Sequence, residues 1–80
     1  MKVTIHSTDK IVILKPDVLS EGVPARVWEG ETESGIKVHC YITRIAIDKN
    51  ETRTDEFTSE LLECQEPSVE ISKIPNRLIL

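Results

Sequence analysis

The feature that most restricts the fold of this chain is a glycine-containing turn at residues 32–36, Thr-Glu-Ser-Gly-Ile. Runs of alternating apolar and polar residues flank it on both sides. The turn fits a three-residue hairpin connection with Gly35 in the left-handed conformation. The sequence therefore predicts a β-hairpin over residues 24–48 at the centre of the fold.

The register of this hairpin follows by counting outward from Thr32 opposite Ile36. The predicted partners are Glu31 with Lys37, Glu29 with His39, Trp28 with Cys40, and Val27 with Tyr41. Opposite charges thus meet across the strands, and each such pair contributes about 0.2–1 kcal/mol. The charges support the register that the turn predicts.

One face of the hairpin is expected to form the core, because its side chains are mostly apolar: Trp28, Ile36, Val38, Cys40 and Ile42. Beyond Ile42 the large apolar residues, Ile45 and Ile47, move to the other parity. A strand keeps a period of two, so we predict a β-bulge near Thr43 and Arg44. The alternative is a strand end covered on both sides by the protein or by a second copy.

The N-terminal region predicts two short strands. Val3 and Ile5 alternate with polar residues, whereas residues 11–14 are continuously apolar. Residues 7–10, Ser-Thr-Asp-Lys, have the composition of a turn between them. Residues 15–22 fit either one helical turn or a loop.

A single helix is predicted over residues 55–65, capped by Thr52 or Thr54 and ended by Pro67. Its apolar positions recur at helical spacing: Phe57, Leu61 and Cys64. After it, Val69 and Ile71 alternate with polar residues and suggest an edge strand. The apolar residues 78–80 are expected to dock on the sheet or on a partner.

Together these elements predict one compact α+β domain over residues 1–80. The expected architecture is a mostly antiparallel sheet of four to five strands, with the helix packed on one face. Only one Trp, one Tyr and one Phe are present, so the core must consist mainly of Ile, Val and Leu. A core this small is often supplemented by a partner subunit.

The net charge of the chain is −4, and its negative charge is concentrated in one segment. Residues 48–70 carry eight acidic and two basic side chains, a net of −6. This balance argues against direct binding to nucleic acid or to an acidic membrane. No apolar run is long enough for a signal peptide or a membrane span, so a cytoplasmic location is expected.

No catalytic, cofactor or metal motif is present. The soft metal ligands are His6, His39, Cys40 and Cys64, and their spacing matches no metal-binding pattern. Cys40 and Cys64 fall on predicted core faces, where we expect buried thiols rather than a disulfide. No nucleophile elbow or phosphate-binding loop occurs, which argues against an enzyme.

The sharpest functional hypothesis is that the acidic helix contacts a basic protein, through Glu56, Glu60 and Glu63. The chain would then be a non-catalytic protein–protein interaction module, expected to form a homodimer. One alternative is an inhibitor that mimics nucleic acid toward a DNA- or RNA-binding protein. A second is a small-ligand binder or minor enzyme that uses the sheet face of three residues: His39, Tyr41 and Glu29.

Overall fold

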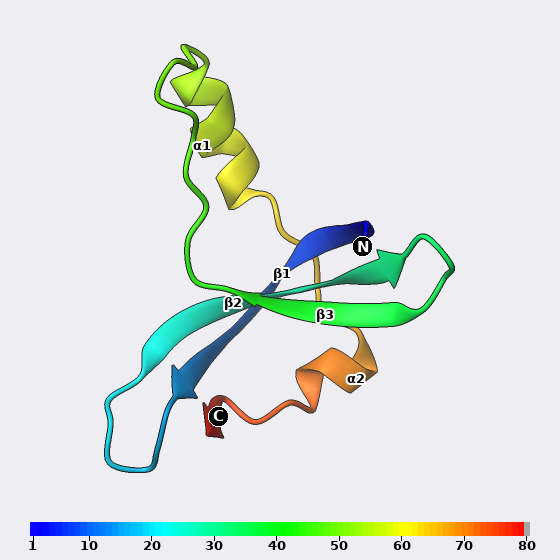
Figure 1. Ribbon diagram of the computed structural model, residues 1–80, viewed down its shortest axis with the longest axis vertical. Helices are drawn as coiled ribbons and strands as arrows, with labels where there is room; N and C mark the ends of the chain where they lie inside the picture. Colours follow the sequence, from blue (N-terminus) through cyan, green and yellow to red (C-terminus); the bar gives the residue numbers. More distant parts are fainter. Residues whose placement is uncertain (80) are drawn as a thin grey trace.

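A four-stranded mixed sheet and one main helix form the fold (Figure 1). The computed structural model describes residues 1–79, and the side chains of residues 1–78. The elements are β1 (Val3–Lys15), β2 (Val23–Thr32), β3 (Lys37–Ile42), α1 (Thr54–Leu62), α2 (Val69–Ser72) and β4 (Arg77–Ile79). The strand order is β3-β2-β1-β4, antiparallel except for the parallel pair of β1 and β4. The predicted α+β class with a mostly antiparallel sheet is confirmed.

The central hairpin has the predicted turn and register. Gly35 has a φ of 86°, and its N–H donates to the Thr32 carbonyl at 3.0 Å. The Thr32 N–H in turn donates to the Ile36 carbonyl at 2.9 Å. The partners are those expected: Glu31 with Lys37, Glu29 with His39, Trp28 with Cys40, and Val27 with Tyr41. A local turn signal was therefore sufficient to set the pairing of β2 and β3.

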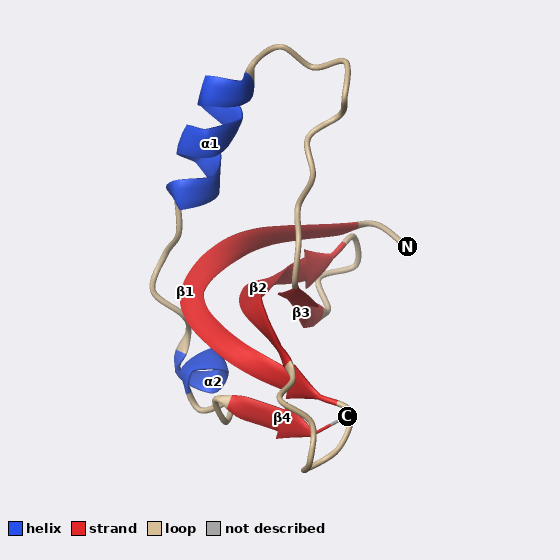
Figure 2. Cartoon of the chain, turned by 90° about the vertical axis from the view of Figure 1, so that its left-hand side faces the viewer, coloured by secondary structure: helices blue, strands red, loops and turns tan. Residues whose placement is uncertain are grey.

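β1 is one long bent strand, so the prediction of two strands joined by a turn is wrong (Figure 2). Its pairing with β2 shifts between Ser7 and Ile11, which makes residues 8–10 a β-bulge. Two contacts to β2 hold this bulge in the sheet. The buried Thr8 hydroxyl donates to the Val27 carbonyl at 2.6 Å, and Arg26 Nη1 donates to the Thr8 carbonyl at 2.7 Å.

β3 ends at Ile42, so the hairpin does not extend to residue 48 and no bulge lies near Thr43 and Arg44. The chain leaves the sheet at this point and runs toward α1 (Figure 1). Two explanations were offered for the shift of the apolar residues after Ile42, a bulge or the end of the strand, and the strand does end there. The chain itself does not cover this end on both sides, because Ile45 is exposed.

The core lies on the face of the sheet opposite to the one predicted. Its buried side chains are Val12, Ala25, Val27 and Ile71, and Leu14, Tyr41, Ile74 and Leu78 pack against them. The expected core residues Trp28, Val38, Cys40 and Ile42 are only half-buried, and Ile36 is 62% exposed. The reason is that α2, through Ile71, packs on the other face. We call the face of Trp28, Val38, Cys40 and Ile42 the open face.

The C-terminal segment forms a short helix where an edge strand was predicted. Ser68 caps α2, since its hydroxyl accepts a hydrogen bond from the Ile71 N–H at 3.3 Å. That side-chain acceptor favours a helical turn over an extended backbone. The apolar terminus docks on the sheet as expected, because Leu78 in β4 pairs with Leu14 in β1. Leu80, which was part of that expectation, lies outside the described residues.

The prediction that the helix packs over the sheet is wrong. α1 has no buried residue and projects from one end of the sheet (Figures 1 and 2). It begins at Thr54, without a side-chain cap from Thr52 or Thr54, and ends before residue 65. It ends early because Gln65 pairs with β1 instead. The Gln65 N–H donates to the Ser7 carbonyl, and the Asp9 N–H donates to the Gln65 carbonyl, both at 3.0 Å.

We predict that replacing Gly30 with Ala destabilises the protein by about 2–3 kcal/mol, because a Cβ there overlaps backbone atoms of β1. It would collide with the Thr4 carbonyl oxygen and lie 2.7 Å from the Ile5 Cα. Gly35→Ala serves as the comparison, since open space surrounds Gly35 and only its positive φ opposes a side chain, at about 1 kcal/mol. Urea unfolding monitored by Trp28 fluorescence measures both. A smaller loss for Gly30→Ala than for Gly35→Ala would contradict the close packing of β1 on β2.

Candidate interaction surface

Residues 43–53 together with α1 form a projecting arm. The chain leaves the end of β3, runs to the far end of α1 and returns through the helix to β1 (Figures 1 and 2). At its base the arm is fixed by the Ser7 hydroxyl, which donates to the Glu63 carbonyl at 2.5 Å. A hollow of about 160 Å³ between its two limbs is lined by Ile47, Glu51, Arg53, Glu56, Phe57 and Glu60. The arm is therefore attached to the body mainly at one end.

The structure brings two of the three predicted contact residues together on the helix. Glu56 and Glu60 lie one turn apart on α1, on the same side, because residues four apart are neighbours on a helix. Glu63 is the C-cap residue and is already extended, with a ψ of 123°. It lines a second hollow together with Glu60, Trp28 and Cys64. Glu60 therefore lines both the hollow between the limbs of the arm and the hollow at its base.

The acidic residues near the C-terminal end of α1 are placed unfavourably in the electric field of the helix dipole. A helix dipole places partial negative charge at the C-terminus, where basic side chains are stabilising. α1 has no basic residue in its last turn, and Glu60 and Glu63 occupy that region instead. Asp55 and Glu56, in the first turn, are placed favourably. Positive charge from outside the chain would therefore stabilise the end of α1 most.

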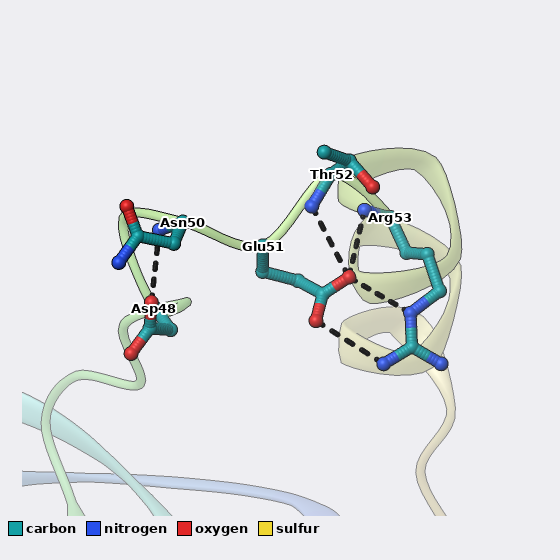
Figure 3. Close-up of polar contacts among 5 residues, drawn as sticks. All are labelled: Asp48, Asn50, Glu51, Thr52 and Arg53. Atoms are coloured by element: carbon teal, nitrogen blue, oxygen red, sulfur yellow. Dashed lines mark hydrogen bonds and ion pairs between the residues drawn. The ribbon is translucent and has the colours of Figure 1, made fainter.

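Arg53, the basic residue that precedes these acids in sequence, is paired with Glu51 (Figure 3), and its charge also interacts with that of Glu60. Its Nε lies 2.8 Å from Glu51 Oε1, and its Nη2 donates to Glu51 Oε2 at 3.1 Å. Glu51 Oε1 also accepts the backbone N–H groups of Thr52 and Arg53, at 3.1 and 3.0 Å. These bonds to Arg53 lower the pKa of Glu51 from 4.5 to about 2. The ion pair therefore shapes the turn that starts α1.

An apolar groove lies at the base of the arm, on the open face. Its volume is about 300 Å³, and its lining includes Trp28, Ile42, Ile45 and Leu61. Leu61 comes from α1, so the helix contributes one wall. The adjacent Leu62 is 79% exposed. The apolar stripe predicted for the helix therefore meets the predicted core face only at this edge, and the rest of both surfaces is uncovered.

The exposed area of the chain is large for its mass. A compact monomer of 9.1 kDa is expected to expose about 4,900 Å², whereas this chain exposes 6418 Å². Its radius of gyration is 14.3 Å, compared with about 11.6 Å expected for 80 residues. The difference in area is about twice what one partner buries in a standard protein–protein interface, roughly 800 Å². The projecting arm contributes to this extended shape (Figures 1 and 2).

The ligand site predicted at His39, Tyr41 and Glu29 lies on the sheet face opposite the open face and is only partly assembled. His39 Nε2 and Tyr41 Oη are 3.0 Å apart, but Tyr41 packs against the core. Glu29 Oε2 accepts the Ser68 N–H at 2.8 Å and so holds the start of α2. His39 and Glu29 line a hollow of about 500 Å³, and β1 adds His6, which was not among the predicted site residues. His6 lies opposite Glu29, a pairing that depends on the register of β1 and could not be counted from a turn.

The two cysteines are free thiols, as expected, but they are not both buried. Cys40 is half-buried on the open face. Cys64 is exposed, because α1 does not cover the sheet and the chain has left the helix at this residue. Among residues 1–79 no three His, Cys, Asp or Glu side chains are grouped closely enough to hold a metal ion.

Comparisons of the chain with protein-family models, with curated proteins and with solved structures found no match. Within the described part of the chain, no helix has the length and apolar character needed to cross a membrane. The geometry and charge of the arm and the sheet are therefore the features that bear on function.

We predict that Arg53→Gln raises the pKa of Glu51 from about 2 toward its ordinary value of 4.5, because the largest cause of the lowering is the Arg53 side chain. Since the folded-state pKa is depressed, the contribution of Glu51 to stability is present above pH 4.5 and is lost as the pH falls toward 2. An NMR titration of the carboxyl carbon measures this pKa. Arg77→Gln, which alters an exposed arginine on β4, is the control. An unchanged titration in Arg53→Gln would show that the ion pair does not form.

Proposed function

We propose that this chain is a small, non-catalytic, cytosolic interaction module that presents the acidic side of α1 to a basic protein surface, and that a second copy is one of its partners. The observation that carries the proposal is the projection of α1 from the sheet without a buried residue. A nine-residue helix is marginally stable on its own, because helices shorter than about 12–15 residues gain too little from propagation. Contact with a partner supplies the packing that the chain itself does not.

The charges of the arm support a basic partner. Glu60 and Glu63 lie near the negative end of the helix dipole without a basic neighbour in the last turn. A lysine or arginine cluster on a partner would relieve this repulsion and pair with Glu56 at the same time. Complementary charge of this kind mainly increases the association rate and selects the partner.

The two alternatives have less support. Mimicry of nucleic acid requires a long row of negative charge, whereas the α1 side offers Glu56 and Glu60, one turn apart. The ligand-binding alternative is supported by the hollow at His39, His6 and Glu29. However, the Glu29 carboxylate already bonds to Ser68. A small molecule that copurifies with the protein and perturbs the NMR signals of His6 and His39 would favour that alternative.

We predict that the triple variant Glu56→Lys, Glu60→Lys, Glu63→Lys loses a basic protein partner that the wild-type protein retains in a pull-down. At a standard interface, unfavourable like-charge contacts cost several kcal/mol, so the loss of affinity should exceed tenfold. The measurement is the amount of each retained protein as a function of salt concentration, and retention by the wild type should fall as salt rises.

The matched control reverses three exposed acids outside α1: Asp9, Glu21 and Glu33. It changes the net charge by the same amount, so it separates a local contact from a general charge effect. Circular dichroism establishes that both variants are folded. Equal retention by the wild type and the α1 variant would exclude the acidic side of α1 as the contact surface.

A further inference from the structure

The outer edge of β3 is the clearest unpaired backbone in the sheet. β3 is the terminal strand of the order β3-β2-β1-β4, so its other side pairs with no strand among residues 1–79. Natural edge strands are commonly protected by proline, by a bulge or by several charges. β3 reads Lys-Val-His-Cys-Tyr-Ile and pairs with β2 without a register shift. Its one formal charge is Lys37, at the first position.

The hairpin geometry shows which backbone groups point outward. Thr32 and Ile36 form a hydrogen-bonded pair, and hydrogen-bonded and non-hydrogen-bonded pairs alternate along an antiparallel ladder. In β3 the N–H and C=O groups of Val38 and Cys40 therefore bond to β2. The outward groups belong to Lys37, His39 and Tyr41.

We propose that the chain forms a symmetric homodimer in which β3 pairs antiparallel with β3 of a second copy, with His39 at the two-fold axis. This interface deepens the proposed function, because it assigns the second copy to the β3 edge and leaves α1 free for the basic partner. The pairing joins two four-stranded sheets into one sheet of eight strands. In this register His39 lies opposite His39 of the second copy, and Lys37 lies opposite Tyr41.

The register is selected by the outward groups. Pairing about His39 matches all three outward residues with outward residues of the second copy. Pairing about Cys40 moves Lys37 opposite Thr43, which lies beyond the end of β3 and is bent out of the strand. Pairing that is centred between two residues places outward groups against inward groups and forms no ladder. The arrangement centred on His39 thus forms the most hydrogen bonds.

The side chains are compatible with the same register. On the open face, Val38 lies opposite Cys40 and Ile36 lies opposite Ile42, so apolar residues meet apolar residues. On the other face, Lys37 meets a tyrosine, and no two lysines face each other. The pairing also places the half-buried open faces of the two copies side by side on one continuous sheet surface. A second copy therefore fits this edge through both its backbone and its side chains.

The register can be tested with a single new cysteine. Val38 and Cys40 of the second copy form a non-hydrogen-bonded pair, whose Cα atoms are about 4.5 Å apart, within the range that a disulfide requires. In the variant Val38→Cys, Cys64→Ser, mild oxidation should convert most of the protein into a covalent dimer on a non-reducing gel. Peptide mapping should show the bond between residues 38 and 40 of different chains.

Two controls make this test specific. Val38→Cys, Cys40→Ser, Cys64→Ser removes the acceptor thiol and should lose most of the covalent dimer. Cys64→Ser alone should also remain uncrosslinked, because a Cys40–Cys40 bond is favoured only by the register centred on Cys40. A dimer through Cys40–Cys40 in this second control, or no 38–40 bond in the test variant, would overturn the proposed interface.

A proline substitution provides a second measurement without cysteine chemistry. The His39 N–H points outward, so His39→Pro should preserve the monomer fold while it removes one donor at the axis. Sedimentation equilibrium should then show a dimer for the wild type and a monomer for His39→Pro. In Cys40→Pro, which removes an N–H bonded to β2, the sheet itself should unfold. A wild-type protein that stays monomeric overturns the interface, whereas the effect of charge reversal on α1 tests the basic partner independently.

Discussion

The rest of the structure depends on the bulge in β1, where one buried hydroxyl holds two strands together. Thr8 is fully buried, donates to the Val27 carbonyl and receives the Lys10 N–H on its oxygen at 3.3 Å. A buried polar group without a partner costs about 1–3 kcal/mol, so these bonds allow the strand to bend rather than break. The bend directs Val12 toward Val27 and Ile71, which form the core. The same bulge pairs with Gln65, and this pairing keeps the chain from continuing α1 as far as residue 65.

This arrangement divides the molecule into a small closed core and two uncovered surfaces. Among residues 1–78, four apolar side chains are buried, and they lie between the sheet and α2. The open face and the arm remain exposed because Gln65 fixes the return of the chain at β1, at the base of α1. The acids of α1 and the free edge of β3 lie on different parts of this exposed surface. The basic partner and the second copy that we propose would therefore bind at separate surfaces.

The sequence allowed a good prediction of the central hairpin, whose determinants are local. Gly35 and the opposite charges across the strands predicted the turn and the four pairs of β2 with β3 that were counted from it. Parity also predicted which side chains share a face, but not which face would be covered. That choice depends on α2, whose alternating Val69 and Ile71 resembled a strand, while the cap at Ser68 favours a helix. Likewise, residues 7–10 have turn composition, and only contacts from Val27, Arg26 and Gln65 keep them in the sheet.

Of the candidate contact residues, Glu56 and Glu60 were brought together because they share a helix, whereas the group of His39, Tyr41 and Glu29 depended on distant pairing and was only partly assembled.

Amide hydrogen exchange can establish whether α1 packs on the sheet of its own chain. Amide protection reports how much free energy is needed to open each segment. In the isolated protein, amides of α1 should exchange far faster than those of β1 and β2 near Val12 and Val27. The α1 amides should become protected only when a basic partner is added. Protection of α1 equal to that of the central strands, in the absence of any partner, would show that the helix packs on the sheet and would contradict this account.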